Sequence, residues 1–151
     1  MDIFSAISKI NNRREIADVL TETGLNYRIC ELGVQSGDNF RQLLRCRPSI
    51  AVAIDLWCDD GVASHNDESV SQDRLDECYR NMVHLSFAEP SVRVIRELTV
   101  RAASLFDDGW FDFVYVDADH SYDGVKQDIA SWYPKVRSGG VFAGHDYLDN
   151  R

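Results

Sequence analysis

The sequence predicts an α/β protein with a doubly wound, mostly parallel sheet of about five strands and helices on both faces. Short apolar runs bounded by turn residues alternate with segments whose apolar residues recur at helical spacing. This alternation favours parallel strands joined by right-handed crossovers. The 151 residues are 44% apolar and 27% charged, as in ordinary globular proteins. We therefore expect a single domain, with a helical cover over residues 1–26 and a sheet core over residues 27–147.

Charge and composition narrow the classes of partner. The net charge of −9 and the pI of about 4.8 argue against binding a nucleic-acid backbone. The first residues lack the basic-then-apolar order of a signal peptide, and no segment approaches a membrane span of about 18 apolar residues. The four cysteines form no C-x-x-C pair that would indicate a zinc ribbon. We expect a cytoplasmic protein that acts on a small molecule, away from membranes.

The first strand and the turn after it organise the rest of the chain. Apolar residues at helical spacing predict one or two helices before residue 24, and the run 27–32 reads as a strand buried on both faces. Gly33 and Gly37 then bracket a tight turn that includes Ser36, where backbone N–H groups can approach a ligand closely. Phe40 and the leucines at 43 and 44 predict a helix that begins near Ser36 or Gly37.

The residue before this turn indicates which nucleotide the site suits. A dinucleotide site needs G-x-G-x-x-G, whereas this chain has Glu31-x-Gly33-x-x-x-Gly37. A carboxylate at Glu31 would repel a pyrophosphate and suits a cationic ligand, such as the amino group or sulfonium region of S-adenosylmethionine. The alternative is that the two glycines only form a turn.

The second and third strands follow at residues 49–56 and 92–95. Asp55 ends the second strand, where an acid can bind both hydroxyls of a ribose, that of NAD or that of S-adenosylmethionine, or else cap a helix. Residues 58–73 are polar and read as a long loop, and a helix begins at Ser71. After the third strand, Leu98 leads to Thr99, the expected N-cap of a helix over residues 100–106.

The fourth strand covers residues 111–116 and the fifth covers 141–143. Asp117, Asp119 and His120 follow the fourth strand. Ser121 is the expected N-cap of a helix that ends near Pro134 and the glycines at 139 and 140. Its expected buried residues are Val125, Ile129, Trp132 and Tyr133.

Polar residues from distant parts of the chain converge at one edge of this sheet. Glu31, Asp55 and Asp117 each stand at the carboxyl end of a strand, and His145 with Asp146 follow the fifth. In a doubly wound sheet this edge is where ligands bind. The chain is therefore expected to hold a ligand there.

The segment 111–147, together with ELGVQSG and IDLW, resembles the class I S-adenosylmethionine-dependent methyltransferases of the "methyltransferase 24" type. These are related to the catechol-type and macrolide-sugar O-methyltransferases. D-A-D-H paired with G-H-D-Y is the most specific part of the resemblance, which covers residues 28–147.

The resemblance implies S-adenosylmethionine as cofactor and a small-molecule acceptor, with transfer to oxygen as the leading interpretation. By it, Glu31 and Gly33 would contact the methionine part, Asp55 the ribose and the Leu98-Thr99 turn the adenine. Ser36, Gly37 and Asp117 are the further expected cofactor contacts.

The same resemblance implies a divalent metal, such as Mg²⁺, at Asp117, His145 and Asp146. Such a cation would lower the pKa of an acceptor hydroxyl. His120, His145 and Asp119 are the candidate catalytic residues, since histidine titrates nearest neutral pH. The nitrogen of His145 would also admit Mn²⁺, Fe²⁺ or Zn²⁺. The alternative is that Asp117 and Asp119 cap the next helix and bind cofactor without a metal.

Three departures from the family pattern bear on these expectations. Catechol-type enzymes place an acid where this chain has His145, which concerns the metal. Relatives tend to have Gly-x-Ser where this chain has Glu97-Leu98-Thr99, which concerns the adenine contacts. Relatives also continue past the fifth strand into an antiparallel pair, which is missing from these 151 residues. A homodimer could cover the open edge. Two alternatives remain: a noncatalytic S-adenosylmethionine-binding module and, on a similar sheet, an NAD-dependent oxidoreductase.

Overall fold

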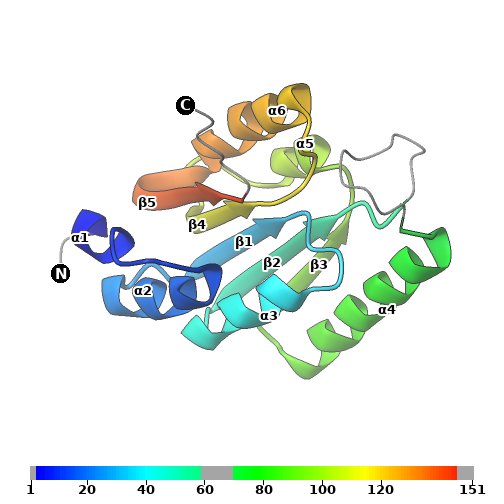
Figure 1. Ribbon diagram of the computed structural model, residues 1–151, viewed down its shortest axis with the longest axis horizontal. Helices are drawn as coiled ribbons and strands as arrows, with labels where there is room; N and C mark the ends of the chain where they lie inside the picture. Colours follow the sequence, from blue (N-terminus) through cyan, green and yellow to red (C-terminus); the bar gives the residue numbers. More distant parts are fainter. Residues whose placement is uncertain (1–2, 59–69, 146–151) are drawn as a thin grey trace.

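The computed structural model describes residues 3–58 and 70–145 and contains one five-stranded sheet (Figure 1). Its strands are β1 (Arg28–Leu32), β2 (Ile50–Asp55), β3 (Val92–Arg96), β4 (Phe111–Val116) and β5 (Val136–Gly144). They lie in the order β3-β2-β1-β4-β5, and every neighbouring pair is parallel. The predicted doubly wound sheet is confirmed. β5 is one of the two edge strands of this sheet, and the expected homodimer stays a prediction.

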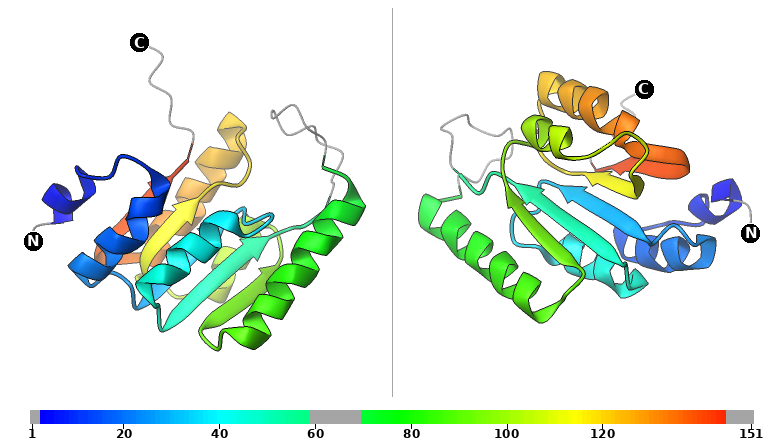
Figure 2. Two further views of the ribbon diagram at one scale, coloured as in Figure 1. Left: turned by 60° about the horizontal axis from the view of Figure 1, so that its bottom comes forward. Right: turned by 180° about the vertical axis from the view of Figure 1, so that it is seen from behind.

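Helices cover both faces of the sheet, as expected (Figures 1 and 2). The helices α2 (Ile16–Thr23), α3 (Asp38–Leu43) and α4 (Gln72–Ala88) lie on one face, with α1 (Ile3–Ile7) beside α2. The other face carries α5 (Thr99–Ala102) and α6 (Tyr122–Trp132). Short 3-10 turns adjoin these helices: η1 (Arg13–Glu15), η2 (Leu44–Cys46), η3 (Ala103–Leu105) and η4 (Tyr133–Lys135).

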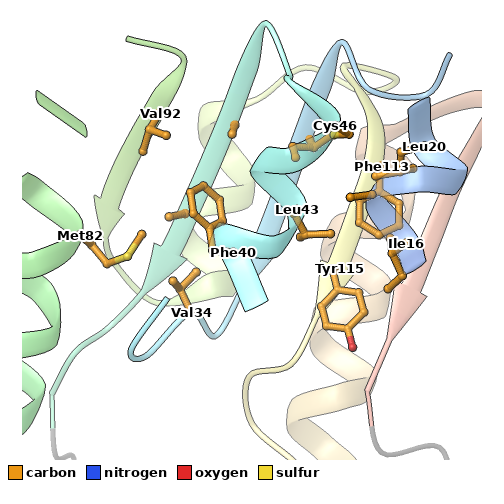
Figure 3. Packing of buried hydrophobic residues seen from close by; sticks show 14 of the residues in the cluster. Ile16, Leu20, Val34, Phe40, Leu43, Cys46, Met82, Val92, Phe113 and Tyr115 are labelled. Atoms are coloured by element: carbon orange, nitrogen blue, oxygen red, sulfur yellow. The ribbon is translucent and has the colours of Figure 1, made fainter. Parts of the chain in front are cut away.

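Each face has its own apolar core, because alternate residues of a strand point to opposite sides. On the first face Leu43 of α3 lies beside Phe113, Phe40 of the same helix lies near Val34, and Met82 of α4 closes the outer side (Figure 3). On the second face Trp132 of α6 is fully buried with residues of β1, β2 and β4. Burial of the sheet on both sides explains why its central strands are apolar throughout.

Hydroxyl caps set the starts of two long helices. Ser71 accepts a hydrogen bond from the N–H of Arg74 at the start of α4, and Ser121 accepts one from the N–H of Gly124 at the start of α6. Both starts were predicted. The prediction for Thr99 was wrong by one residue, because Leu98 is the N-cap of α5 and makes no side-chain cap.

The fifth strand begins five residues earlier than predicted, at Val136. Phe111 pairs with Val136, but Phe113 pairs with Val141, so the four residues 137–140 stand against the single residue Asp112 and make the strand irregular. Arg137 anchors it, since its Nε donates to Asp112 Oδ1 at 2.6 Å. The glycines at 139 and 140 therefore interrupt a strand and do not end a helix.

The expected buried face of α6 was only partly right. Trp132 is buried, whereas three other residues are exposed by 37%, 46% and 66%: Val125, Ile129 and Tyr133. The other buried residue of α6 is Asp128, which accepts a hydrogen bond from the Thr99 hydroxyl. The Trp132 indole also donates to the Thr99 carbonyl, at 2.9 Å. These hydrogen bonds fix the rotation of α6 so that its polar residue Asp128 faces α5.

Some sequence predictions fall outside the described residues. Most of the predicted loop 58–73 lies in residues 59–69, and Asp146 lies in residues 146–151. Within residues 3–58 and 70–145, no helix has the combined length and apolar character needed to cross a membrane.

Candidate functional site

The strand order reverses between β1 and β4, and the candidate site lies at the carboxyl ends of these strands. The N–H of Asp117 donates to the Leu32 carbonyl, and the N–H of Gly33 donates to the Ile54 carbonyl, both at 2.9 Å. These bonds extend the ladders beyond the strand ends. The side chains that follow β1, β2 and β4 are thereby held side by side.

Both glycines of the turn are required by the backbone. Gly33 has φ +79°, and a Cβ there would overlap the carbonyl oxygen of Asp117. Gly37 also has φ +79°, and a Cβ there would overlap the sulfur of Met82. Gly37 is the N-cap of α3, which confirms the predicted helix start. The Ser36 hydroxyl donates to Asp38 Oδ2 at 2.8 Å.

Glu31 is a buried acid that has one hydrogen bond. Its side chain is 2% exposed, and its Oε1 accepts from Nδ2 of Asn39 at 3.2 Å. Among the described residues, Glu31 Oε2 and Asn39 Oδ1 have no hydrogen-bond donor. Two buried acceptors without donors carry a desolvation cost that a ligand with N–H groups could remove.

Burial raises the pKa of Glu31 to about 8. The hydrogen bond from Asn39 opposes this rise, and the negative charge of Asp117 adds to it. A cation bound beside Glu31 would favour the ionised carboxylate. The charge and the free acceptors of this pair fit an ammonium or sulfonium group, and so the predicted methionine part of S-adenosylmethionine.

Asp55 accepts two backbone hydrogen bonds from different loops. The N–H of Gln35 donates to Oδ2 at 2.8 Å, and the N–H of Trp57 donates to Oδ1 at 2.7 Å. Burial raises the pKa of Asp55, and these hydrogen bonds hold it lower than burial alone would. Asp55 ends β2 and caps none of the helices in residues 3–58 and 70–145, because the next of these helices, α4, is capped by Ser71.

Asp117 lies between two imidazoles. Its Oδ1 is 3.2 Å from Nε2 of His120 and 3.5 Å from Nδ1 of His145, and the carboxylate is 19% exposed. The structure thus brings together two predicted catalytic histidines and one predicted cofactor or metal ligand. A carboxylate beside an imidazole orients the ring.

The other predicted site residues point elsewhere. Asp119 accepts hydrogen bonds from the backbone N–H and the hydroxyl of Ser121, at 2.8 and 2.9 Å, at the start of α6. The Thr99 hydroxyl faces Asp128, as described above. Leu98, by contrast, is 43% exposed. A contact between the Leu98-Thr99 turn and adenine would therefore use the Leu98 side chain and the backbone.

The donor groups near Asp117 bear on the predicted metal. Within residues 3–58 and 70–145, no cluster of three or more His, Cys, Asp and Glu side chains could hold a metal ion. The described pair, Asp117 and His145, supplies one oxygen and one nitrogen, a mixed set more typical of transition metals than of Mg²⁺. The third expected ligand, Asp146, is outside the described residues. The metal therefore stays a prediction.

An apolar groove of about 660 Å³ runs beside this edge, between the N-terminal segment and β4 and β5. Ile7, Val19, Phe113 and Tyr115 are among its lining residues. Arg13 and His145 also line it. Its volume is in the range of pockets for small organic molecules.

Sequence reasoning missed Asn39, Gln35 and Trp57 as members of the site. Asn39 stands two residues after Gly37 in the first turn of α3, so helical geometry could have placed it over the strand that carries Glu31. Gln35 and Trp57 contact Asp55 through their backbone N–H groups, which no residue-type pattern reveals.

Comparisons with solved structures find the same fold. A "putative caffeoyl-CoA O-methyltransferase" from Staphylococcus aureus superposes with a TM-score of 0.61 and 15% identity, over 94% of this chain and 62% of that one. A 1,6-didemethyltoxoflavin-N1-methyltransferase from Burkholderia thailandensis, with bound 1,6-didemethyltoxoflavin and S-adenosylhomocysteine, gives a TM-score of 0.53 and 13% identity, over 90% of this chain and 52% of that one.

The spermidine synthase of Thermotoga maritima gives a TM-score of 0.58 and 14% identity, over 86% of this chain and 42% of that one. This chain thus spans between 42% and 62% of the three solved chains. Because one of them is named a synthase, likeness of fold leaves the transferred group open.

Sequence comparison identifies the family. A search of curated proteins finds no match to this chain. The sequence profile of the methyltransferase 24 family, described as a methyltransferase domain, matches residues 30–147, which include the glycine turn, Glu31, Asp55 and Asp117. The chain therefore belongs to the methyltransferase 24 family, as its sequence motifs predicted.

Proposed function

We propose that this chain binds S-adenosylmethionine and transfers its methyl group to an oxygen of a small molecule. The observation that carries the proposal is the buried pair of Glu31 and Asn39, whose two free acceptor oxygens stand beside the glycine turn. S-adenosylmethionine supplies an electrophilic methyl group on a sulfonium. In this proposal Glu31 holds the amino group, and the ionised carboxylate then has a cationic partner.

Asp55 is proposed to bind the ribose. Each of its oxygens already accepts one backbone N–H, at 2.7 and 2.8 Å. A carboxylate has about four acceptor sites, so about two remain for the two ribose hydroxyls. The exposed Leu98 side chain, one strand further along the same edge, is proposed to cover the adenine.

The acceptor is proposed to lie in the apolar groove, with its reacting hydroxyl toward His145. The largely apolar lining suits an aromatic or alkyl body. His145 or His120 would take the hydroxyl proton, and Asp117, which lies within 3.5 Å of both rings, would stabilise the charged imidazole. Asp119 accepts a hydrogen bond from Ser121 at the start of α6, and His120 lies in the turn between them. The proposed part of Asp119 in catalysis is to fix this turn.

A metal-assisted version of this reaction would use Asp117, His145 and Asp146. A divalent cation would lower the pKa of the acceptor hydroxyl, so that less work falls on the histidines. Chelation with EDTA separates the two versions once an acceptor is known. Loss of turnover that Mg²⁺ or Mn²⁺ restores supports the metal, and unchanged turnover supports the histidines alone.

Titration calorimetry with S-adenosylhomocysteine tests the cofactor proposal. We expect wild-type protein to bind and Asp55→Ala to bind at least about tenfold more weakly, since two hydroxyls lose their acceptor. Asp108→Ala is the control, because the Asp108 side chain is 74% exposed and lies before β4, at the amino end of the strands and away from the site.

Binding of NADH in place of S-adenosylhomocysteine would favour an oxidoreductase and refute the proposal. Binding of S-adenosylhomocysteine without turnover on catechols, sugars or polyketides would favour a noncatalytic module. Turnover on any of these acceptors would exclude that module.

A further inference from the structure

We infer that Trp57 is a positioning residue for cofactor binding, because its indole N–H locks the glycine turn onto the Asp55 carboxylate. The inference rests on the proposed role of Asp55 as the ribose acceptor. It adds a residue that lies beyond β2 and that the family motifs described above leave without a role.

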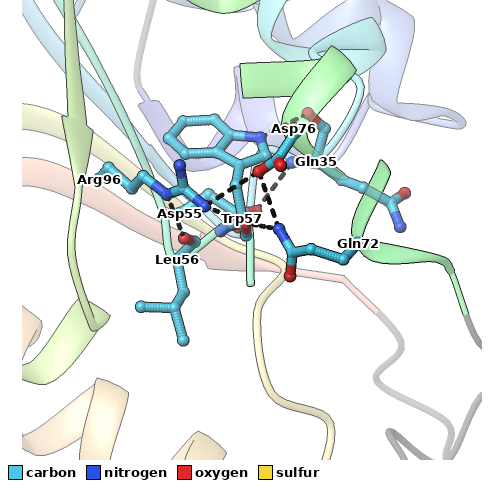
Figure 4. A network of polar contacts seen from close by, with 7 residues as sticks. All are labelled: Gln35, Asp55, Leu56, Trp57, Gln72, Asp76 and Arg96. Carbon is cyan, nitrogen blue, oxygen red and sulfur yellow. Dashed lines mark hydrogen bonds and ion pairs between the residues drawn. The ribbon is translucent and has the colours of Figure 1, made fainter. Parts of the chain in front are cut away.

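Trp57, Gln35 and Asp55 form a closed set of three hydrogen bonds (Figure 4). The Trp57 indole, which is fully buried, donates from Nε1 to the Gln35 carbonyl at 2.9 Å. The backbone N–H groups of Trp57 and Gln35 donate to the two oxygens of Asp55. Two loops that end different strands thus hold one carboxylate, and the indole ties those loops to each other.

The backbone of both loop residues is strained. Gln35 and Trp57 each have φ +44°, in the left-handed region that residues with a Cβ seldom adopt. In the described part of the chain, only one other non-glycine residue, Arg47, has a positive φ. Strain of this kind persists only where surrounding contacts enforce it, and it gathers at functional sites.

The rest of the network fixes Trp57 itself. Its carbonyl accepts from Nη2 of Arg96 at 2.7 Å and from Nε2 of Gln72 at 3.1 Å. Both donors also contact Asp76, at 3.3 and 2.8 Å (Figure 4). Trp57 is thus held both by β3, through Arg96, and by α4, through Gln72. The indole packs against the ring of Tyr79, with centroids 5.2 Å apart.

These contacts fix the orientation of the Asp55 carboxylate before a ligand binds. With one acceptor site on each oxygen filled, the remaining sites of Asp55 face a fixed direction. A ligand with two adjacent hydroxyls would then bind without first ordering the side chain, and this lowers the cost of binding. The ligand class is a ribonucleoside with both hydroxyls free.

The test is a double-mutant cycle with S-adenosylhomocysteine, using titrations carried to millimolar ligand. Trp57→Phe removes the indole N–H, and we expect it to weaken binding by about three- to tenfold. In the Asp55→Asn background the same substitution should weaken binding by less than about twofold, because the group through which Trp57 acts has been changed.

Two further variants control for packing. Benzothienylalanine in place of Trp57 keeps the shape of the ring system without the N–H, and it should weaken binding by the same roughly three- to tenfold. It tests the N–H even if the smaller Phe unfolds the protein. Trp110→Phe is the matched control, since Trp110 precedes β4 at the opposite edge of the sheet and should leave affinity unchanged.

Wild-type affinity in the Trp57→Phe and benzothienylalanine proteins would overturn the inference, and so would an equal loss in both Asp55 backgrounds. Either result would leave the proposed function standing, because the wild-type protein would still bind. Failure of the wild-type protein to bind S-adenosylhomocysteine would overturn the proposed function, and the inference with it.

Discussion

Glu31→Gln should make the protein more stable at neutral pH while weakening its hold on cofactor. The carboxyl group is buried, with a pKa of about 8 against an ordinary value of 4.5. Because the folded state binds the proton more tightly, stability is fully present below about pH 4.5 and is lost as the pH rises toward 8. The substituted glutamine carries no such titration, and its amide can donate to Asn39 Oδ1, which lacks a donor.

The size of the effect follows from the difference between the two pKa values. One pKa unit corresponds to about 1.4 kcal/mol, so the cost is about 5 kcal/mol at full ionisation. At pH 7 the group is still mostly protonated in the folded state and ionised in the unfolded state, which gives about 3 kcal/mol. For a chain of this length that is on the order of 10 °C in melting temperature.

Urea unfolding at pH 5, 6, 7 and 8 measures this free energy. The wild-type protein should lose about 2.5 kcal/mol between pH 5 and pH 7 relative to Glu31→Gln, whose profile should lack this component. Glu22→Gln, at an exposed position of α2, should keep the wild-type slope. Parallel profiles for the wild type and Glu31→Gln would refute the burial argument, and undiminished binding of S-adenosylhomocysteine by Glu31→Gln would refute the role of the carboxylate.

Two further substitutions test how the site is held. Gly33→Ala should cost more than about 3 kcal/mol in urea unfolding, because the new Cβ meets the Asp117 carbonyl, whereas Gly24→Ala, with φ +69° and open space around it, should cost only about 1 kcal/mol. Equal costs would mean that β1 and β4 can separate freely. Asp112→Ala should cost about 3 kcal/mol of unfolding free energy, because Asp112 is buried and accepts hydrogen bonds from the Arg28 N–H and from Arg137. The control, Asp108→Ala, removes an exposed carboxylate paired with Lys135 and should cost under about 1 kcal/mol. A loss below about 0.5 kcal/mol for Asp112→Ala would show that the irregular start of β5 needs no anchor.

The buried acid beside the glycine turn illustrates a trade between stability and function. An apolar residue at position 31 would suit the core better than a carboxyl group with a free oxygen. The chain instead keeps two buried acceptors that have no hydrogen-bond donor among the described residues, as the proposed ligand site requires. Its location at the point where the strand order reverses matches the place where this class of sheet binds ligands.

The sequence by itself determined the fold class, the strand count and the edge where polar residues gather. Hydrophobic periodicity and the residues that begin or end an element are local properties of the sequence. The apolar runs, the glycines at 33 and 37, and the caps at Ser71 and Ser121 each act within a few residues. The rule that parallel strands end at one edge then placed Glu31 and Asp55 together, and the family motifs identified the methyltransferase domain.

Only the tertiary structure decided which partners these residues have. Asn39 meets Glu31 because α3 crosses back over β1, and Asp117 lies between two histidines because β4 and β5 are neighbours. The rotation of α6 and the early start of β5 depend on hydrogen bonds across 25 or more residues, from Thr99 to Asp128 and from Arg137 to Asp112. Such contacts join residues through backbone geometry and packing, and local residue patterns carry no record of them.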